Sequence, residues 1–502
     1  MWLCPLDSLI DMETVAGEIF ANVSVLGYWV SLLAGAFCGI FFGAVPGVSA
    51  TMAIALLVPF TFGMDIVGSI ALLLGIFFGA IYGGSIPAIL FKTPGTPASA
   101  AVIFDGYPLM RAGQAGRALS LASVSMLAGA AIGSALLVFL APQISQIALK
   151  FGPAELFAMA SFGIITIVAV SDGPLLKGIL SALAGLLLSC IGMDPMSGYP
   201  RYIFGTAGLM EGLPFIPVLI GLFAVSGALA GKSDSGIEKN DVKVRFCELP
   251  PLSDLKKTWK TMFKSGILGA FIGATPGAGC DIAAFVSYGM AKHSAMQGDK
   301  FGSGEVKGVA AVESAKAACT SGTLIPLLSL GIPGDSVTAI LVGALVLHGV
   351  QPGPLLFENN PALAGTILAT VVFAHFAVFA LALASVRWST LILKLDEKYI
   401  KAGVLLLSIV GSYALRNNMG DVWITFVFGI VGIAMQKAKF PVAPFLLALI
   451  LGQMAEVNFR RAAMLEDGSP LFILNSPIAL GILVAAFVFF AAASFKRLRK
   501  RM

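Results

Sequence analysis

The sequence predicts an all-α, polytopic membrane protein with about 10–13 transmembrane segments. Composition is the first observation behind this fold class: of 502 residues, 58% are hydrophobic and only 12% are charged. Water-soluble domains carry roughly 25% charged residues, so this chain lacks the polar surface that a soluble particle of its size needs. The second observation is that apolar stretches near the ~20 residues of a bilayer span recur along the whole chain. They cover residues 19–42, 66–90, 118–141, 175–193, 366–386 and 478–495.

An internal repeat is the third observation. Three short segments of the first half recur in the second half in the same order, two of them at offsets of 230 and 239 residues. Motifs that recur in one order at nearly one offset indicate a duplicated structural unit. The matched pairs are 39–47 with 269–277, 86–95 with 325–334 and, more weakly, 214–221 with 441–448.

The repeat and the distribution of charge divide the chain into four parts. We expect a first transmembrane repeat (1–231), a cytoplasmic linker (232–264), a second transmembrane repeat (265–476), and an extra C-terminal helix with a basic cytoplasmic tail (477–502). The linker carries eight basic and five acidic residues, whereas the first 91 residues contain no Lys or Arg. The positive-inside rule therefore places the linker and the C-terminus in the cytoplasm and the N-terminus outside.

These positions give the two repeats opposite orientations in the membrane. The first repeat begins outside and the second begins inside, so we expect an inverted repeat of the kind found in secondary transporters. Lys292, Lys300 and Lys307 fit this topology poorly if their loop is external.

Two kinds of site are not expected. The basic clusters are typical of segments that flank membrane helices, so they do not indicate a nucleic-acid partner. The six cysteines show no CxxC spacing and lie mostly in apolar segments, so neither a metal site nor a cofactor is expected.

Pro-Gly pairs interrupt the apolar sequence at four repeated positions. Proline removes a backbone donor and glycine loosens a helix, so each pair predicts a break whose freed backbone groups need partners. Secondary transporters bind solutes at such breaks, where half-helix N-termini face anions and unwound carbonyls face cations. A single pair would more simply be a kink without a ligand, but the duplication favours a binding site.

Hydroxyl groups and one lysine accompany these breaks. A hydroxyl beside a free backbone N–H can hold a carboxylate, and Lys92 could add a positive charge. The candidate substrate-binding residues are Pro46, Gly47, Ser49, Lys92, Thr93, Pro94, Gly95, Thr96, Ser99, Pro276, Gly277, Pro333, Gly334, Ser336 and Thr338.

Acidic residues in apolar surroundings are the candidates for ion coupling. Asp281 and Asp335 follow two of the breaks, and an ionisable group inside the membrane by default indicates a functional site. Asp335 fits equally well as the N-cap of the following half-helix. Glu313 and Lys316 are three residues apart and more simply form a structural ion pair.

The motifs resemble those of the large membrane subunit of tripartite tricarboxylate transporters, the TctA family. The similarity extends over about residues 35–477 and is carried by residues 39–47, 92–97, 105–108, 331–334 and 444–461. It implies a bacterial inner-membrane permease that works in the lipid bilayer with a small membrane subunit and a periplasmic solute-binding protein. It further implies uptake of a citrate-like di- or tricarboxylate driven by a sodium or proton gradient. The resemblance supplies no residue rule for the particular carboxylate.

Two other functions fit the sequence less well than a carrier. An intramembrane enzyme needs a nucleophile–base pair or metal ligands, and the chain has three histidines and neither an HExxH nor a G-x-S-x-G motif. A site built from carboxylates alone would still be compatible with an enzyme. A channel or scaffold needs no alternating access, whereas duplicated breaks beside acidic groups fit a coupled carrier better. We therefore expect a carrier rather than an enzyme, with the substrate held between hairpin-like elements around Pro94 and Pro333.

Overall fold

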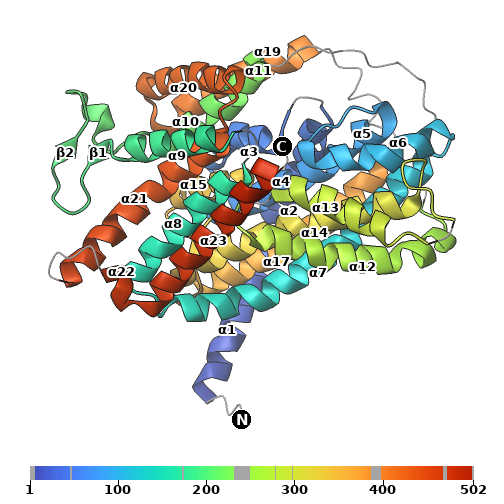
Figure 1. Ribbon diagram of the computed structural model, residues 1–502, viewed down its shortest axis with the longest axis horizontal. Helices are drawn as coiled ribbons and strands as arrows, with labels where there is room; N and C mark the ends of the chain where they lie inside the picture. The colour runs from blue at the N-terminus through green and yellow to red at the C-terminus, as the bar shows by residue number, and fades with distance from the viewer. Residues whose placement is uncertain are drawn as a thin grey trace.

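The computed structural model describes residues 6–45, 48–171, 174–230, 249–277, 279–296, 298–385, 397–466 and 472–499. In this part of the chain nearly every element is a helix, and one short hairpin, β1–β2, forms the sheet (Figure 1). Seven helices are long and apolar enough to cross a bilayer, and six shorter apolar helices accompany them. These findings confirm the predicted all-α polytopic membrane protein.

The described part of the first half begins with α1 and ends with α11. Its elements are α1 (Leu6–Ser24), α2 (Leu26–Ala44), α3 (Ala50–Leu57), η1 (Val58–Thr61), α4 (Ile66–Gly83), α5 (Ser85–Phe91), η2 (Pro97–Val102), α6 (Ile103–Arg111), α7 (Ala115–Ala148), α8 (Pro153–Val170), α9 (Leu175–Ser189), β1 (Gly192–Met193), β2 (Pro200–Arg201), η3 (Ala207–Leu209), α10 (Phe215–Leu219), η4 (Ile220–Val225) and α11 (Ser226–Ala230).

The second half is entirely helical where it is described. Its elements are α12 (Leu252–Ala274), α13 (Gly279–His293), α14 (Val306–Leu330), α15 (Ser336–Leu347), α16 (Pro354–Asn359), α17 (Pro361–Ser385), α19 (Glu397–Arg416), α20 (Met419–Lys437), α21 (Val442–Leu465), α22 (Phe472–Asn475) and α23 (Pro477–Arg499). Helix α12 thus begins inside the range expected as the linker, of which residues 232–248 lie outside the described part.

The repeated glycine motif packs in the same way in both halves. A Cβ atom added to Gly39 or Gly43 of α2 would lie 2.4 or 2.3 Å from a carbonyl oxygen of α4. At the matching Gly269 and Gly273 of α12, the added atom would lie 2.2 or 2.4 Å from a carbonyl oxygen of α14. Small residues allow membrane helices this close backbone approach. In both pairs the contacts advance along the two helices in the same direction, so each pair runs parallel and the segment between them returns.

A third glycine contact joins the two halves. On α7, a Cβ added to Gly129 or Gly133 would lie 2.0 or 2.6 Å from a carbonyl oxygen of α14. Helix α14 is buried along almost its whole length between α7, α12 and α13 (Figure 1). Because α7 and α14 come from different halves, the centre of the molecule is shared between the repeats.

The matched helices α4 and α14 pack against each other antiparallel. Residues 69–74 of α4 line a cavity together with residues 324–328 of α14. Toward the other end of the pair, the Ile81 carbonyl oxygen lies 3.4 Å from the Lys316 ammonium and Ser85 bonds Glu313. The antiparallel packing supports an inverted relation, which stays a prediction for the repeats as wholes.

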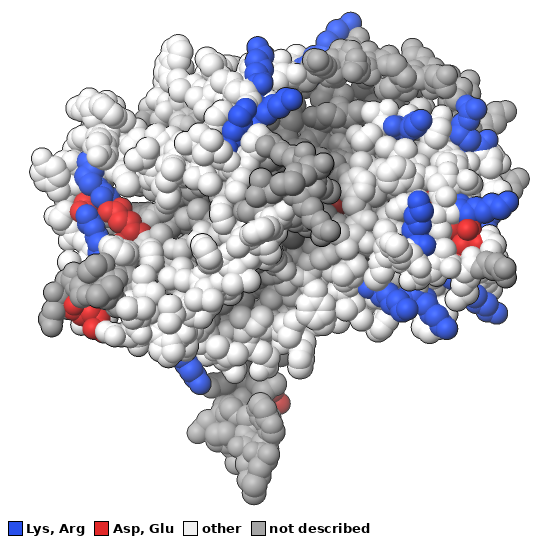
Figure 2. All heavy atoms as spheres, viewed as in Figure 1, with Lys and Arg blue, Asp and Glu red and all other residues white. Residues whose placement is uncertain are grey.

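Basic residues gather at one end of the molecule, over α12 and α13 (Figure 2). Lys257 of α12 lies 2.8 Å from Glu305, and Lys307 lies 2.7 Å from Asp299. The hydrogen bond from Lys307 holds the pKa of the Asp299 carboxyl below its usual range. The loop between α13 and α14 therefore lies at the same end of the molecule as the start of α12. Lys292, beside this loop, thus lies at the same end as the start of α12, and the side of the membrane that this end faces stays a prediction.

Asp105 fastens this loop to the first half of the chain. Its Oδ1 accepts hydrogen bonds from the backbone N–H groups of Gly302 (2.8 Å), Gly304 (3.0 Å) and Glu305 (2.9 Å). Its Oδ2 accepts a hydrogen bond of 3.0 Å from the Tyr288 hydroxyl, and the side chain is fully buried. The carboxylate is thus a structural clamp between α6 and the start of α14.

Candidate functional site

The two helix breaks of the second half contact each other. In the second half, the Gly277 N–H donates a 2.6 Å hydrogen bond to the Gly334 carbonyl. Gly277 has a φ of +86°, a conformation that favours glycine. In the first half, Gly95 lies so close to the end of α2 that an added Cβ would be 2.0 Å from the Gly43 oxygen. Pro46 and Gly47, which follow α2, lie outside the described residues.

The helix ends before the second pair of breaks have the same backbone geometry. Helix α5 ends at Lys92 and α14 ends at Gly331, both in the left-handed region with φ of +58° and +72°. The Thr93 N–H donates to the Pro87 carbonyl, and the Ile332 N–H makes the matching bond in the second half. Lysine is strained at a positive φ, whereas glycine is not. The contacts around the end of α5 must therefore hold Lys92 in this conformation.

The side chains of the first-half hairpin separate into two groups. Lys92 is exposed, and its ammonium lies 5.9 Å from the centre of the Tyr107 ring. The Thr93 hydroxyl donates to the Phe91 carbonyl, and Pro94 is half-buried. In contrast, Thr96 and Ser99 are buried and point into the protein centre, as described below. The structure therefore brings Thr96 and Ser99 together, and it places Lys92 away from them.

Half-helix N-termini from opposite halves converge at a pair of hydroxyls. Ser49 caps α3 by accepting a 3.1 Å hydrogen bond from the Met52 N–H. The Thr51 hydroxyl in the first turn of α3 lies 3.2 Å from the Ser336 hydroxyl in the first turn of α15. A helix N-terminus carries a partial positive charge and free N–H groups, so two of them meeting suits an anion.

The two ion-coupling candidates both lie at the start of a half-helix. The Asp335 carboxylate accepts hydrogen bonds of 2.8 Å from the N–H and the hydroxyl of Thr338, which completes a capping box at α15. Asp335 is therefore the N-cap of α15, which is one of its two predicted roles. Asp281 lies in the first turn of α13 with an exposed side chain. Pro333 is buried beside Gly334, and ion binding at either aspartate stays a prediction.

A buried polar cluster at the centre was only partly predicted. Glu313 and Lys316 form the expected ion pair, with Lys316 Nζ 3.0 Å from Glu313 Oε1. Ser85 donates a 2.7 Å hydrogen bond to the same Oε1 and also accepts one from Lys316. Lys316 further donates to Ser99 at 3.1 Å, and Ser99 lies 3.0 Å from the Thr96 hydroxyl. The pair is thus connected to the predicted substrate hairpin, which no sequence spacing indicated.

Two of the three histidines, His348 and His375, have hydrogen-bond partners. His375 lies 2.8 Å from the Val371 carbonyl through Nδ1 and 3.4 Å from the Thr320 hydroxyl through Nε2, and it stacks on Phe78. His348 lies 3.1 Å from the Thr61 hydroxyl. Among the described residues, no three His, Cys, Asp or Glu side chains are arranged to hold a metal ion.

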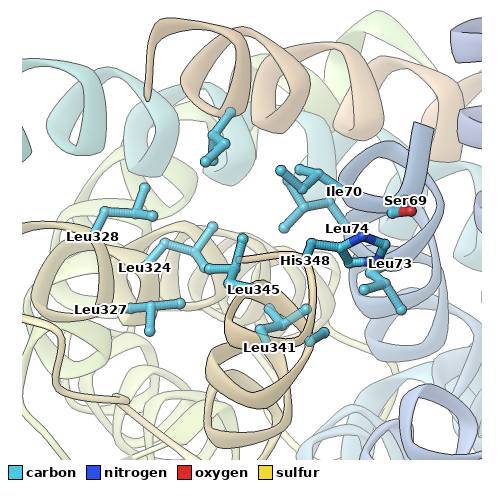
Figure 3. Close-up of a pocket in the computed structure, with 12 residues that line it drawn as sticks. Ser69, Ile70, Leu73, Leu74, Leu324, Leu327, Leu328, Leu341, Leu345 and His348 are labelled. Atoms are coloured by element: carbon cyan, nitrogen blue, oxygen red, sulfur yellow. The ribbon is translucent and has the colours of Figure 1, made fainter. Parts of the chain in front are cut away.

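An apolar cavity lies between α4, α14 and α15 (Figure 3). Leucines of the three helices point into it, with Ser69 and His348 at one side. A carboxylate would lose its hydration there without finding enough polar partners. We therefore do not assign the substrate to this cavity.

These features together define a class of protein. Helix breaks that meet in the second half, half-helix N-termini that converge across the halves and a buried ion pair at the centre fit the architecture of a membrane transporter. Residues 30–447 match the family described as Tripartite tricarboxylate transporter TctA family. The chain therefore belongs to the TctA family.

Two relatives come from Agrobacterium vitis. The "Uncharacterized 52.8 kDa protein in TAR-I ttuC' 3'region" is 32% identical over 492 residues, covering 96% of this chain and 98% of the relative. The "Uncharacterized protein in TAR-II ttuC' 3'region" is 32% identical over 233 residues, covering 46% of this chain and 96% of the relative. Among solved structures, a mutant manganese transporter of Eremococcus coleocola aligns over 94% of this chain and 96% of its own. With 14% identity and a TM-score of 0.11, that alignment carries no structural argument.

Proposed function

We propose that this chain is the permease subunit of a tripartite transporter that takes up a citrate-like di- or tricarboxylate across the bacterial inner membrane. The observation that carries the proposal is the meeting of the α3 and α15 N-termini at Thr51 and Ser336. Each N-terminus carries partial positive charge, and the two hydroxyls at the meeting point can donate hydrogen bonds to a carboxylate group.

The proposed orientation follows the side chains at the two ends. Gln436 at the end of α20 bonds Ser226 of α11, which leads to the linker, so Lys437 and Lys439 share the linker side. At the other end, Arg416 and Arg460 are paired with carboxylates. An excess of basic residues on the linker side supports a cytoplasmic linker.

The same reasoning supports a cytoplasmic C-terminus. Glu155 at the start of α8 accepts a hydrogen bond from Ser476, just before α23. Helix α8 leads toward α9, where Lys177 donates to the Ala438 carbonyl at the end of α20. Because α23 begins beside the start of α8 and packs along it, its basic end reaches the linker side.

The proposed mechanism is alternating access coupled to an ion gradient. By analogy with other carboxylate carriers that have inverted hairpins, one bundle moves against the other while the substrate stays between the two hairpins. The partners are a small membrane subunit and a periplasmic solute-binding protein, as the tripartite family implies. The coupling ion is sodium or a proton, with Asp281 and Asp335 as candidate ligands.

Uptake into proteoliposomes tests this function. The vesicles contain the chain and its small subunit, with the cognate binding protein outside, and labelled citrate, tartrate, succinate and glutarate are offered under separate sodium and pH gradients. Gradient-driven uptake that depends on the binding protein supports the proposal. Persistence of uptake in both Asp281→Asn and Asp335→Asn removes the ion-site assignment and leaves the carrier. Absence of transport for every solute, while the binding protein still docks, contradicts the proposed function.

A further inference from the structure

The two oxygens of the Glu313 carboxylate have different surroundings. Oε1 contacts both Lys316 and Ser85, at 3.0 and 2.7 Å. Oε2 has no hydrogen-bond partner among the described residues, although the side chain is 0% exposed. A structural ion pair in a dry interior is stable when its remaining lone pairs are also satisfied. Oε2 can therefore accept a hydrogen bond or a proton from a group that enters beside it.

Glu313 lines a small cavity next to this pair. The cavity is about the size of one water molecule. The titratable groups that face it are Lys316 on the same helix, Tyr82 on α4 and His375 on α17. Met126 of α7 also lines the cavity. Ser85 of α5 and Ser99 of η2 contact the ion pair itself, and the Ser123 hydroxyl of α7 lies 2.7 Å from the Tyr82 hydroxyl. No second carboxylate of the described chain lines this cavity.

The surroundings favour a proton over a metal cation. Hard cations need several oxygen ligands at once. Here the Lys316 ammonium already occupies Oε1 and repels a second cation. A proton needs only one oxygen, and it removes the negative charge whose burial is costly.

Lys316 connects Glu313 to the predicted substrate hairpin. It donates a hydrogen bond to Ser99, which in turn lies 3.0 Å from Thr96. With Glu313 ionised, the pair is electrically neutral. Once Oε2 has taken up a proton from the aqueous phase, the Lys316 charge is no longer compensated, and it attracts a carboxylate to the hairpin. Conversely, a bound carboxylate disfavours ionised Glu313, because coupling between two binding events is reciprocal.

We propose that Glu313 is the proton-coupling site of this carrier, and that Lys316 transmits its protonation state to the carboxylate-binding hairpin. One proton enters from the outer solution with the substrate and leaves to the cytoplasm after it. This inference rests on the proposed carboxylate uptake.

Glu313→Gln separates coupling from transport. Glutamine is always neutral and has nearly the same shape, so it imitates the protonated state. In proteoliposomes, accumulation driven by a pH gradient should fall at least about tenfold, which lies within the usual range of coupling between sites. Exchange of labelled for unlabelled substrate without a gradient should stay within about threefold of the wild type. Glu358→Gln, which removes an exposed carboxylate on α16, is the matched control and should behave as the wild type in both assays.

Each outcome is decisive. Accumulation that survives in Glu313→Gln refutes the proposal, and so does loss of exchange in a folded variant, because the role would then be structural or in substrate binding. If Glu313→Gln does not fold, Glu313→Asp replaces it. The pH profile of exchange should then shift by half a unit or more, and an unchanged profile refutes the proposal.

Measurements on the wild type separate the proton-site proposal from the proposed carboxylate uptake on which it rests. Accumulation under a sodium gradient but not under a pH gradient keeps the carrier and refutes the proton site. Absence of both accumulation and exchange for every carboxylate refutes the proposed function itself.

Discussion

Replacing Asp105 by asparagine tests the clamp between the two halves of the chain. The carboxylate Oδ1 accepts three backbone N–H bonds of 2.8 to 3.0 Å from the loop before α14. Asparagine keeps one oxygen in this place but removes the charge. A hydrogen bond to a charged group contributes about 1 kcal/mol more than a neutral one, so three bonds amount to about 3 kcal/mol.

Hydrogen exchange measures this loss locally. A decrease of about 3 kcal/mol in the free energy of opening corresponds to roughly 100-fold faster exchange of the loop amides. The N–H groups of Gly302, Gly304 and Glu305 are the reporters, followed by mass spectrometry in detergent or nanodiscs. Tyr288→Phe removes only the hydroxyl that bonds Oδ2 and should change these rates far less. Exchange in Asp105→Asn within about threefold of the wild type would refute the charge-assisted clamp.

Three further predictions concern packing, substrate binding and pH. Gly269→Leu should abolish stable folding, because even a Cβ there lies 2.2 Å from a carbonyl of α14, whereas Gly289→Leu, with no atom within 4 Å of its Cβ, should be tolerated; size-exclusion profiles and thermal melting compare them. Ser336→Ala should raise the KM for the transported carboxylate about 5- to 10-fold with a smaller effect on maximal rate, as loss of one hydrogen bond implies, and an unchanged KM argues against the α3–α15 site. The hydrogen bond from Arg460 holds the pKa of Asp194 well below its usual range, so its stabilisation of the β1–β2 turn is present above the ordinary aspartate pKa of about 4 and is lost as pH falls through the lowered pKa. Arg460→Gln should therefore speed amide exchange in this turn at pH 7, and the difference from the wild type should shrink in acid.

Local chemistry explains what the sequence could predict. Apolar runs report the fold class because a bilayer imposes a minimum length on each span. Proline and glycine change the conformation of their own backbone. The helix breaks after α5, α12 and α14 therefore occur where the Pro-Gly pairs stand in the sequence. Ser49 and Asp335 cap the half-helices that follow, because a short polar side chain before a helix satisfies its free N–H groups.

Long-range contacts explain what the sequence could not predict. The end of the molecule at which the loop after Lys292 lies depends on whether α13 continues in the direction of α12 or turns back beside it. The composition of α13 allows either course. Apart from Glu313, the partners of Lys316 come from residues more than 200 positions away in sequence, and no spacing indicates them. Lys92 has the right charge for a substrate ligand, yet the left-handed turn at the end of α5 directs its side chain toward Tyr107.

The glycine contacts of α14 determine which helices can travel together. Backbone pressed against backbone has no side chain that can change rotamer, so α7, α12 and α14 resist sliding past one another and behave as one block. Helices α2 and α4 form a second block for the same reason. The seam between the blocks holds leucine side chains at one end and the Glu313–Ser85 contact at the other, and leucines can repack as two surfaces shear. A small displacement of one block would thus leave the helices intact while it lengthens or shortens the hydrogen bonds that Ser85 makes with Glu313 and Lys316.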